Sequence, residues 1–158
     1  MKVEFINPFL RAAKNVLETM CQTQVIPKKA FLKEDKHTFG EVTGIIGMAS
    51  AEVSGCMILS FSEKCIINIV ASMLMEDAKE RIDDEIIDAV GELTNMICGG
   101  AKATLGQMNH KFDLATPTMI TGKGVEISTL SESPTIVIPF DTKYGGFVIE
   151  ANLADKKN

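Results

Sequence analysis

The sequence predicts a single domain of the α/β class, α+β in type, in which an antiparallel or mixed sheet packs with helices that include one long central helix. Three observations support this prediction. The chain has 158 residues, 46% of them hydrophobic, which is enough for one substantial core. Residues 53–61 alternate with the period of a strand, and residues 83–105 repeat with the period of a helix. We place the domain at residues 1–153 and a polar tail at residues 154–158.

The first helix is predicted to begin at Asn7 and to end near Thr23. Asparagine is a favoured capping residue, and Pro8 suits the first helical position. Beyond it, apolar side chains recur at helical spacing, namely Leu10, Ala13, Val16, Leu17 and Met20. One side of this helix should therefore pack against the core.

Residues 24–61 are predicted to form a meander of three strands, at residues 25–33, 38–48 and 53–61. A second helix should follow at residues 63–75, capped by Ser62. It is apolar on most of its surface, so we expect it to be largely buried. Residues 76–84 carry seven charged side chains in nine positions, which is typical of a solvated connector.

The central helix, residues 83–105, carries two different stripes, because successive residues are about 100° apart around a helix. The stripe expected to face the core consists of Ile86, Val90, Leu93, Ile97 and Ala101. The opposite stripe consists of Asp88, Glu92, Asn95 and Gly99. Its three polar members stand at i, i+4 and i+7, so three short polar groups point the same way on successive turns.

Two adjacent glycines, Gly99 and Gly100, lie on this helix, where each costs about 1 kcal/mol relative to alanine. Either the helix ends there, or a neighbour requires bare backbone. Because residues 101–105 favour a helix, we expect it to continue toward Gly106. The bare backbone would then serve a crossing between helices or a docking surface.

Residues 106–124 have no clear period and are predicted to form a loop with a short strand at residues 118–121. Three strands should complete the chain, at residues 125–130, 135–140 and 146–153. Pro139 has no N–H for a ladder, which indicates a sheet edge or a bulge. Exposed apolar edges are usually covered, so we expect a homodimer that pairs through edge strands.

The net charge of −5 and the scattered basic residues argue against a nucleic-acid or anionic-membrane partner. Glu4 and Pro8 interrupt the amino-terminal segment where a secretory signal would be apolar. The most apolar segment, residues 65–75, is too short to span a membrane. We therefore expect a cytoplasmic protein.

The sequence offers no metal site or cofactor site of its own. The four cysteines have no C-x-x-C pairing and lie in apolar segments, which indicates reduced, buried thiols. His37 and His110 have no ligand spacing around them. There is also no phosphate-binding P-loop and no C-x5-R phosphatase loop.

The pattern Asp88-x3-Glu92-x2-Asn95-x21-Pro117 resembles the signature of the CheC/CheX/FliY phosphatases, which dephosphorylate the chemotaxis response regulator CheY. The likeness is closest to the CheX branch and extends over nearly the whole chain, including NPFLRAAKNVLETM, GELTNMICGGAKATL and IVIPF. It implies a CheX/CheC-like fold with an internal pseudo-repeat. The first helix has Arg11 and Lys14 where the central helix has Glu92 and Asn95, so one active site per chain is expected.

The residue types indicate how such a site would work. The carboxamide of Asn95 is no general base near neutral pH, but it can hold a water molecule in line with a phosphorus atom. The resemblance implies that Glu92 reaches a lysine in the active site of the receiver. We assign Asp88 a supporting contact, Pro117 a loop-shaping role and Gly99 a place on the docking surface. The receiver should supply both the aspartyl phosphate and Mg2+.

Two alternatives use the same helix face. One is a non-catalytic adaptor that binds receivers or flagellar-switch components, as kinship with FliM-type proteins would allow. The other is a structural dimer domain with a vestigial site. Measured hydrolysis would separate either of them from a phosphatase.

Overall fold

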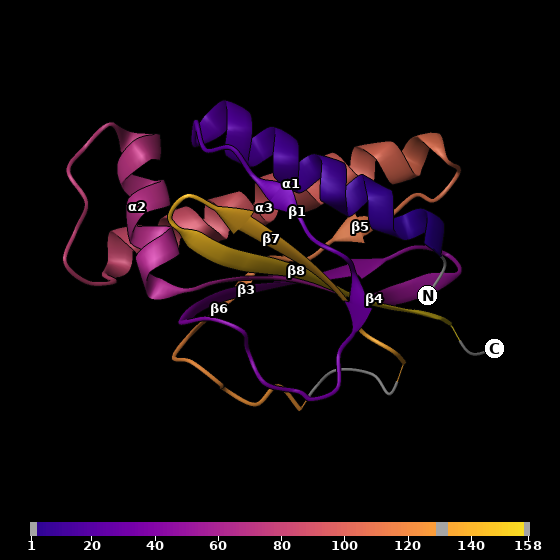
Figure 1. The fold of residues 1–158 in the computed structure, drawn as a ribbon. Coiled ribbons are helices and arrows are strands. Elements are labelled where there is room, and N and C mark those ends of the chain that lie inside the picture. The colour runs from indigo at the N-terminus through magenta and orange to yellow at the C-terminus, as the bar shows by residue number, and fades with distance from the viewer. Residues whose placement is uncertain (1–2, 129–132, 157–158) are drawn as a thin grey trace.

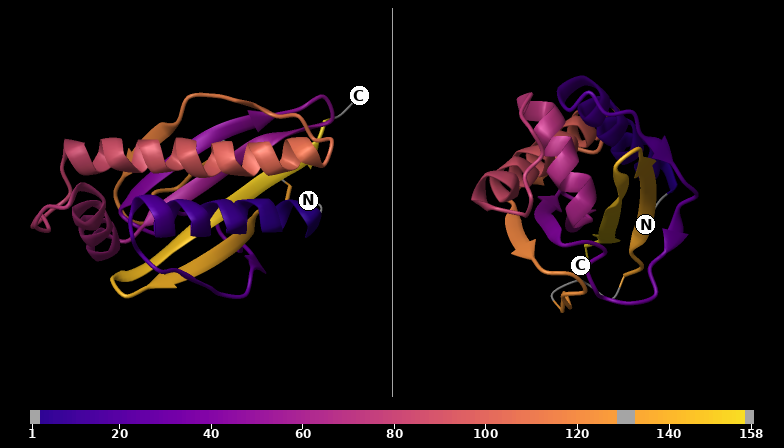
Figure 2. Two further views of the ribbon diagram at one scale, coloured as in Figure 1. Left: turned by 90° about the horizontal axis from the view of Figure 1, so that it is seen from above. Right: turned by 60° about the vertical axis from the view of Figure 1, so that its left-hand side comes forward.

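The computed structural model describes residues 3–128 and 133–156, which form one antiparallel sheet with its α-helices gathered on one face (Figures 1 and 2). A 3-10 turn, η1, precedes the first helix. In chain order the elements are η1 (Val3–Phe5), α1 (Ile6–Met20), β1 (Ile26–Pro27), β2 (Phe31–Leu32), β3 (Val42–Ala49), β4 (Val53–Phe61), α2 (Glu63–Leu74), α3 (Asp84–Gln107), β5 (Asp113–Leu114), β6 (Thr118–Thr121), β7 (Ile136–Thr142) and β8 (Gly145–Asp155).

Eight strands of the described chain pair in the order β1-β7-β8-β4-β3-β5, while β2 also pairs with β7 and β6 also pairs with β3. Every pairing is antiparallel. The longest runs between β4 and β8, from the pair Val53 and Asp155 to the pair Phe61 and Phe147. The sheet and its long helix confirm the predicted fold class.

The two faces of the sheet differ, because successive strand residues point to opposite sides. On β8, the side chains of Phe147, Ile149, Ala151 and Leu153 belong to the core beneath the helices. Val148 and Glu150 lie on the other face, which the segments after β2 and after β6 partly cover (Figure 1). The molecule therefore has a large core on one side of the sheet and a thinner layer on the other.

Helices α1 and α3 lie side by side across the sheet (Figure 2). A Cβ atom at Gly100 would lie 3.2 Å from the Cβ atom of Ala12, so bare backbone at residue 100 serves this crossing. A Cβ atom at Gly99 would meet no atom of the described residues within 4 Å. Of the two uses considered for the paired glycines, helix packing accounts for Gly100 alone.

Several predicted boundaries are confirmed. The strand at Val53–Phe61 and the short strand at Thr118–Thr121 match the prediction. The central helix continues through both glycines and ends at Gln107, two residues beyond the predicted stretch. None of the described helices is both long enough and apolar enough to cross a membrane.

Other local predictions are wrong. Helix α1 begins at Ile6, and Asn7 does not cap it, because the preceding turn buries Phe5 and carries the helix back past the asparagine. Ser62 holds the N-cap position of α2 but makes no capping hydrogen bond. Its hydroxyl instead donates to the carbonyl oxygen of Gly146 on β8, at 3.3 Å.

The strand predicted at residues 25–33 is reduced to β1 and β2, two residues each. Pro139 of β7 lies level with the interruption between them, where its missing N–H costs no ladder bond. The strand predicted at residues 125–130 is absent over residues 125–128, where Glu126 makes only an isolated bridge with His37; residues 129 and 130 lie outside the described part. Strand β8 extends two residues beyond the boundary predicted at residue 153.

Candidate active site

Helix α3 presents a continuous polar stripe to solvent because its other side is held in the core. The buried side includes Ile86, Ala89, Val90, Leu93, Thr94, Ile97, Cys98, Ala101 and Leu105. Asp88, Glu92 and Asn95 are exposed, as the helical period predicts. The structure thus places these three residues on one accessible line of a single rigid element.

The start of α3 is fixed by its own capping interactions. Asp83 occupies the N-cap, where its Oδ1 accepts a hydrogen bond of 3.0 Å from the backbone N–H of Ile86. The ammonium group of Lys79 lies 2.5 Å from Oδ2 of Asp83 and 2.9 Å from Oε1 of Glu85. Two hydrogen bonds lower the pKa of Asp83. The one from Lys79 has the larger effect, and the one from the backbone N–H of Ile86 has the smaller. An ionised cap therefore anchors the end of the helix nearest the stripe.

A groove of about 370 Å3 runs between α3 and the chain that leads into β6. Asp88, Glu92 and Asn95 line one side of it, and Pro117 lines the other. Residues 42–45 of β3 pair with β6, which holds this second wall beside the helix. All four residues were selected from the sequence. The structure brings Pro117 beside the other three, although 21 residues separate it from Asn95 in the chain.

Gly91 and Met119 also line the groove, and the sequence analysis missed both. A Cβ atom at Gly91 would lie 3.6 Å from the sulfur atom of Met119, so the missing side chain at residue 91 leaves the groove deeper. The signal was present in the spacing. Gly91 stands beside the stripe on the helical wheel, and Met119 lies two residues after Pro117 on the predicted short strand.

The side chains of Glu92 and Asn95 are available to a partner. Over residues 3–128 and 133–156, no hydrogen bond or ion pair engages either group. Their exposure leaves the two amide hydrogens and the carbonyl oxygen of Asn95 free to bind water or a phosphoryl oxygen. The carboxylate of Glu92, one turn away, can accept hydrogen bonds from a cationic side chain.

Gly99, the fourth member of the stripe, does not line this groove. It borders a second groove of about 560 Å3 near the end of α3, together with Lys102, Gly106, Lys111 and Phe112. Lys102 and Gly106 continue the same helical line, so the exposed face of α3 extends beyond the polar triplet. Gly99 is therefore next to the site in space but separate from its groove.

The cysteine thiols are poor candidates for a nucleophile. All four are free. Burial raises the thiol pKa to about 11 for Cys21, Cys56 and Cys65, and to about 12 for Cys98. The thiolate form is correspondingly scarce at neutral pH. Among the described residues, no group of three or more His, Cys, Asp or Glu side chains is arranged to hold a metal ion.

The groove therefore presents an amide, which can orient water, and a carboxylate, which can bind a cation. Groups of these two kinds can position a phosphorylated substrate and the water that attacks it.

Residues 42–141 match the family model described as chemotaxis phosphatase CheX. A curated relative, the CheY-P phosphatase CheX of Thermotoga maritima, is 28% identical over 96 residues. That match covers 61% of this chain and 59% of the relative, so the chain spans less than two thirds of the length of this relative.

Solved structures resemble the chain over nearly its full length. A CheC-like superfamily protein from Shewanella sp. PV-4 is 41% identical, with a TM-score of 0.89 over 99% of this chain and 100% of that one. A chain from the CheX-CheY-BeF3-Mg2+ complex of Borrelia burgdorferi is 25% identical, with a TM-score of 0.79 over 99% of this chain and 100% of that one.

Proposed function

Because the chain belongs to the chemotaxis phosphatase CheX family, we propose that it hydrolyses the aspartyl phosphate of a CheY-like receiver by inserting Glu92 and Asn95 into the receiver's active site. The strongest support for this proposal comes from the position of these two side chains. Glu92 and Asn95 stand one turn apart and exposed, with no partner among the described residues, on a helix fixed at its N-terminus and along its buried side.

In the proposed reaction, Asn95 orients a water molecule for in-line attack. The water oxygen forms a bond to phosphorus, and the bond between phosphorus and the aspartyl oxygen breaks. The receiver's carboxylate and inorganic phosphate are the products, and the proton of the water passes to phosphate or solvent. An acyl phosphate is already labile, and each tenfold acceleration requires only about 1.4 kcal/mol. Positioning by one amide is therefore a sufficient contribution.

Glu92 has a docking role in this proposal. Its carboxylate pairs with a lysine of the receiver and sets the depth to which Asn95 enters. Asp88 adds a supporting contact, Pro117 shapes the opposite wall of the groove, and Gly99 lets the partner approach α3 closely. The receiver provides Mg2+, which agrees with the presence of Mg2+ in the named complex of the Borrelia relative.

The proposal includes a homodimer that forms through edge strands. The short strands β1 and β2 lie at one side of the sheet and expose three large apolar side chains, Ile26 at 60%, Phe31 at 53% and Leu32 at 59%. Apolar edge residues of this kind are usually covered in the functional state. The protein would act in the cytoplasm, where its receiver is expected.

The test is phosphate release from a panel of phosphorylated receivers of the same organism, measured with Mg2+ and with the purified chain. Asn95→Ala should lower kcat by at least about tenfold, and Glu92→Ala should mainly raise KM. Asn15→Ala is the matched control, because Asn15 is an exposed asparagine on the neighbouring helix α1. Both site variants should retain the wild-type circular dichroism spectrum and melting temperature.

Two outcomes would contradict the proposal. If Asn95→Ala and Glu92→Ala release phosphate as fast as the wild-type chain, these residues have no catalytic or docking role. If the wild-type chain binds phosphorylated receivers but accelerates none of them, the chain is an adaptor that uses the same helix face.

A further inference from the structure

The second groove beside α3, about 560 Å3 in volume, carries a charge opposite in sign to that of the first. Its charged lining consists of Lys102, Lys111 and Asp113, which leaves a net positive charge, and we call it the lysine groove. The charged lining of the first groove consists of Asp88 and Glu92, which are both acidic. A partner that covers both grooves must therefore present charges of both signs in a fixed order along α3.

Both lysines of this groove are available to a partner. Lys102 is exposed on α3, and Lys111 is exposed in the segment that leads into β5. Over residues 3–128 and 133–156, neither ammonium group forms an ion pair or a hydrogen bond, and Asp113 forms no ion pair. A partner that covered the two ammonium groups without a carboxylate opposite them would remove their water and replace it with nothing. The chemistry that fits this groove is therefore an acidic protein surface.

The lysine groove lies within reach of any protein that binds the polar stripe of α3. The helix runs without a break from Asp84 to Gln107 (Figure 2). Lys102 follows Asn95 by seven residues, which is about 10 Å along a helix that rises 1.5 Å per residue. A protein interface of standard size buries roughly 800 Å2 on each partner, the area of a disc about 16 Å in radius. An interface centred on Asn95 therefore extends over Lys102.

We propose that the lysine groove selects the receiver, because Lys102 and Lys111 pair with receiver carboxylates that lie roughly 10 Å from the phosphorylated aspartate. This inference rests on the function proposed above, which places Asn95 at the phosphoryl group. A receiver with carboxylates at that place docks with a lysine opposite Glu92 and its acidic side over the lysine groove. A receiver with basic side chains there is repelled. The opposite charges of the two grooves thus fix both the choice of receiver and its direction along α3.

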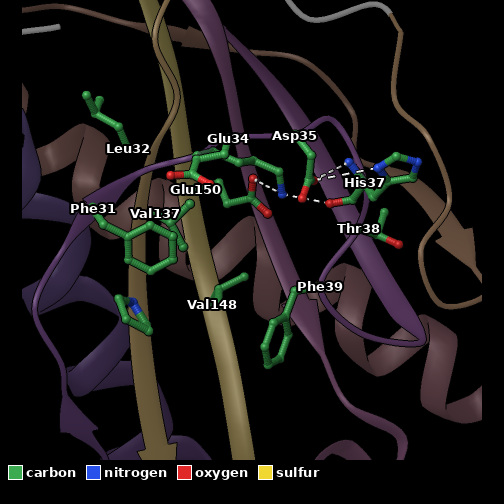
Figure 3. A pocket seen from close by; sticks show the side chains of 12 residues that line it. Phe31, Leu32, Glu34, Asp35, His37, Thr38, Phe39, Val137, Val148 and Glu150 are labelled. Atoms are coloured by element: carbon green, nitrogen blue, oxygen red, sulfur yellow. Dashed lines mark hydrogen bonds and ion pairs between the residues drawn. The ribbon is translucent and has the colours of Figure 1, made fainter.

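A cavity of about 860 Å3 on the other face of the sheet is separate from this docking surface (Figure 3). It shares no lining residue with either groove beside α3. Phe31 and Leu32, which line it, are edge residues that the proposed homodimer covers. The carboxylate of Glu150 inside it already pairs with the Lys33 ammonium at 2.8 Å. The exposed face of α3 is therefore the surface left for the receiver.

The test is charge reversal, measured as phosphate release from the panel of phosphorylated receivers with Mg2+. Lys102→Glu together with Lys111→Glu should raise KM at least about tenfold and leave kcat unchanged, because two attractions become repulsions. The difference in KM between the double variant and the wild type should narrow as the ionic strength rises, since salt screens exposed charges. Lys123→Glu makes the same change of charge in the turn after β6 and should keep the wild-type KM.

An exchange of charges between the two proteins locates the contact. Lys102→Glu should recover a low KM with a receiver variant in which one carboxylate, roughly 10 Å from the phosphorylated aspartate, is replaced by lysine. It should not recover with the unmodified receiver. A lysine near the carboxyl end of a helix also stabilises the helix dipole. That role alone would lower the melting temperature of Lys102→Glu and leave KM unchanged, so both are measured.

The outcomes separate this inference from the proposed function. If the double variant keeps the wild-type KM on a receiver whose hydrolysis depends on Asn95, the lysine groove does not select the receiver, and the proposed function stands. If KM rises equally in Lys123→Glu, the effect comes from net charge, and the inference is wrong. If the wild-type chain accelerates hydrolysis of no receiver, the proposed function fails and this inference fails with it.

Discussion

Gly44 on β3 and Thr94 on α3 meet so closely that a Cβ atom at residue 44 would lie 2.2 Å from the Thr94 hydroxyl oxygen. Thr94 is fully buried, and its hydroxyl donates to the carbonyl oxygen of Val90 at 2.7 Å. Because Asn95 is the next residue, about 100° further around the helix, this contact fixes the rotation of α3 that points Asn95 outward. The bare backbone of Gly44 therefore sets the geometry of the candidate site from beneath.

Gly44→Ala should destabilise the fold by about 1–3 kcal/mol, the usual cost of overpacking, because Thr94 is β-branched and has little freedom to turn away. Urea unfolding measures the loss. Gly47→Ala on the same strand is the matched control, since its Cβ atom would meet the Cβ atom of Ala115 at an ordinary 3.5 Å. Adding Thr94→Ala to Gly44→Ala should recover part of the stability. If Gly44→Ala unfolds at the same urea concentration as Gly47→Ala, the contact does not constrain α3.

Gly91 offers a way to close the groove without touching its polar side chains. Gly91→Ala places a methyl group at contact distance from Met119 and should raise the unfolding free energy by up to about 1 kcal/mol, the gain of a helical alanine over glycine. Gly91→Leu should fold equally well but fill the groove beside Glu92 and Asn95. We expect kcat/KM for phosphate release to fall at least about tenfold in the leucine variant alone. Full activity of Gly91→Leu would show that the receiver does not enter this groove.

Gly99 and Gly100 should respond differently to the same substitution. Gly99→Ala has open space around it and should stabilise the helix by about 1 kcal/mol. Gly100→Ala should gain less, because its methyl group would press against Ala12 at 3.2 Å. Thermal unfolding compares the two variants directly.

The docking role proposed for Gly99 can be measured separately. Gly99→Leu should raise KM for the phosphorylated receiver and leave kcat unchanged, because the bulk lies on the approach surface and outside the groove. An unchanged KM would remove Gly99 from the docking surface while leaving Glu92 and Asn95 in place.

The features that the sequence predicts well depend on local periodicity. The exposed line of Asp88, Glu92 and Asn95 follows from the helical repeat, because the apolar residues opposite them decide which side is buried. Strand β4 is equally well defined by its alternation. Pro117 was linked to the stripe only through the family resemblance, and the pairing of β6 with β3 supplies the physical reason for its position.

The features that were mispredicted depend on contacts distant in sequence. The start of α1 is set by Phe5, whose ring lies 4.8 Å from His110 and 6.3 Å from Phe112, more than 100 residues away in the chain. Strands β1 and β2 are short because residues 24–33 pair with β7 at only two separate places. The cavity lined by Phe31, Val137 and Glu150 draws on three strands, β2, β7 and β8, so no single stretch of the sequence predicts it.

Glu150 should make stability depend on pH in a direction opposite to that of most carboxylates. Burial raises its pKa above the ordinary 4.5, and the nearby Lys33 offsets only part of that rise. At pH values from about 4.5 upward, the Glu150 carboxyl group therefore holds its proton more often in the folded state than in the unfolded state. As the pH increases through this range, the unfolding free energy falls. Glu150→Gln removes the titrating group, so its contribution to the slope of unfolding free energy against pH disappears.

Urea unfolding at a series of pH values from 4.5 to neutrality measures this effect. Relative to the wild type, Glu150→Gln should become progressively more favourable as the pH rises, whatever its stability at the acidic end. Glu52→Gln, at an exposed glutamate, is the control and should leave the slope unchanged. If the curves of the wild type and Glu150→Gln stay parallel, the carboxyl group titrates alike in the folded and unfolded chains. Glu150 would then be better solvated in solution than its 1% exposure indicates.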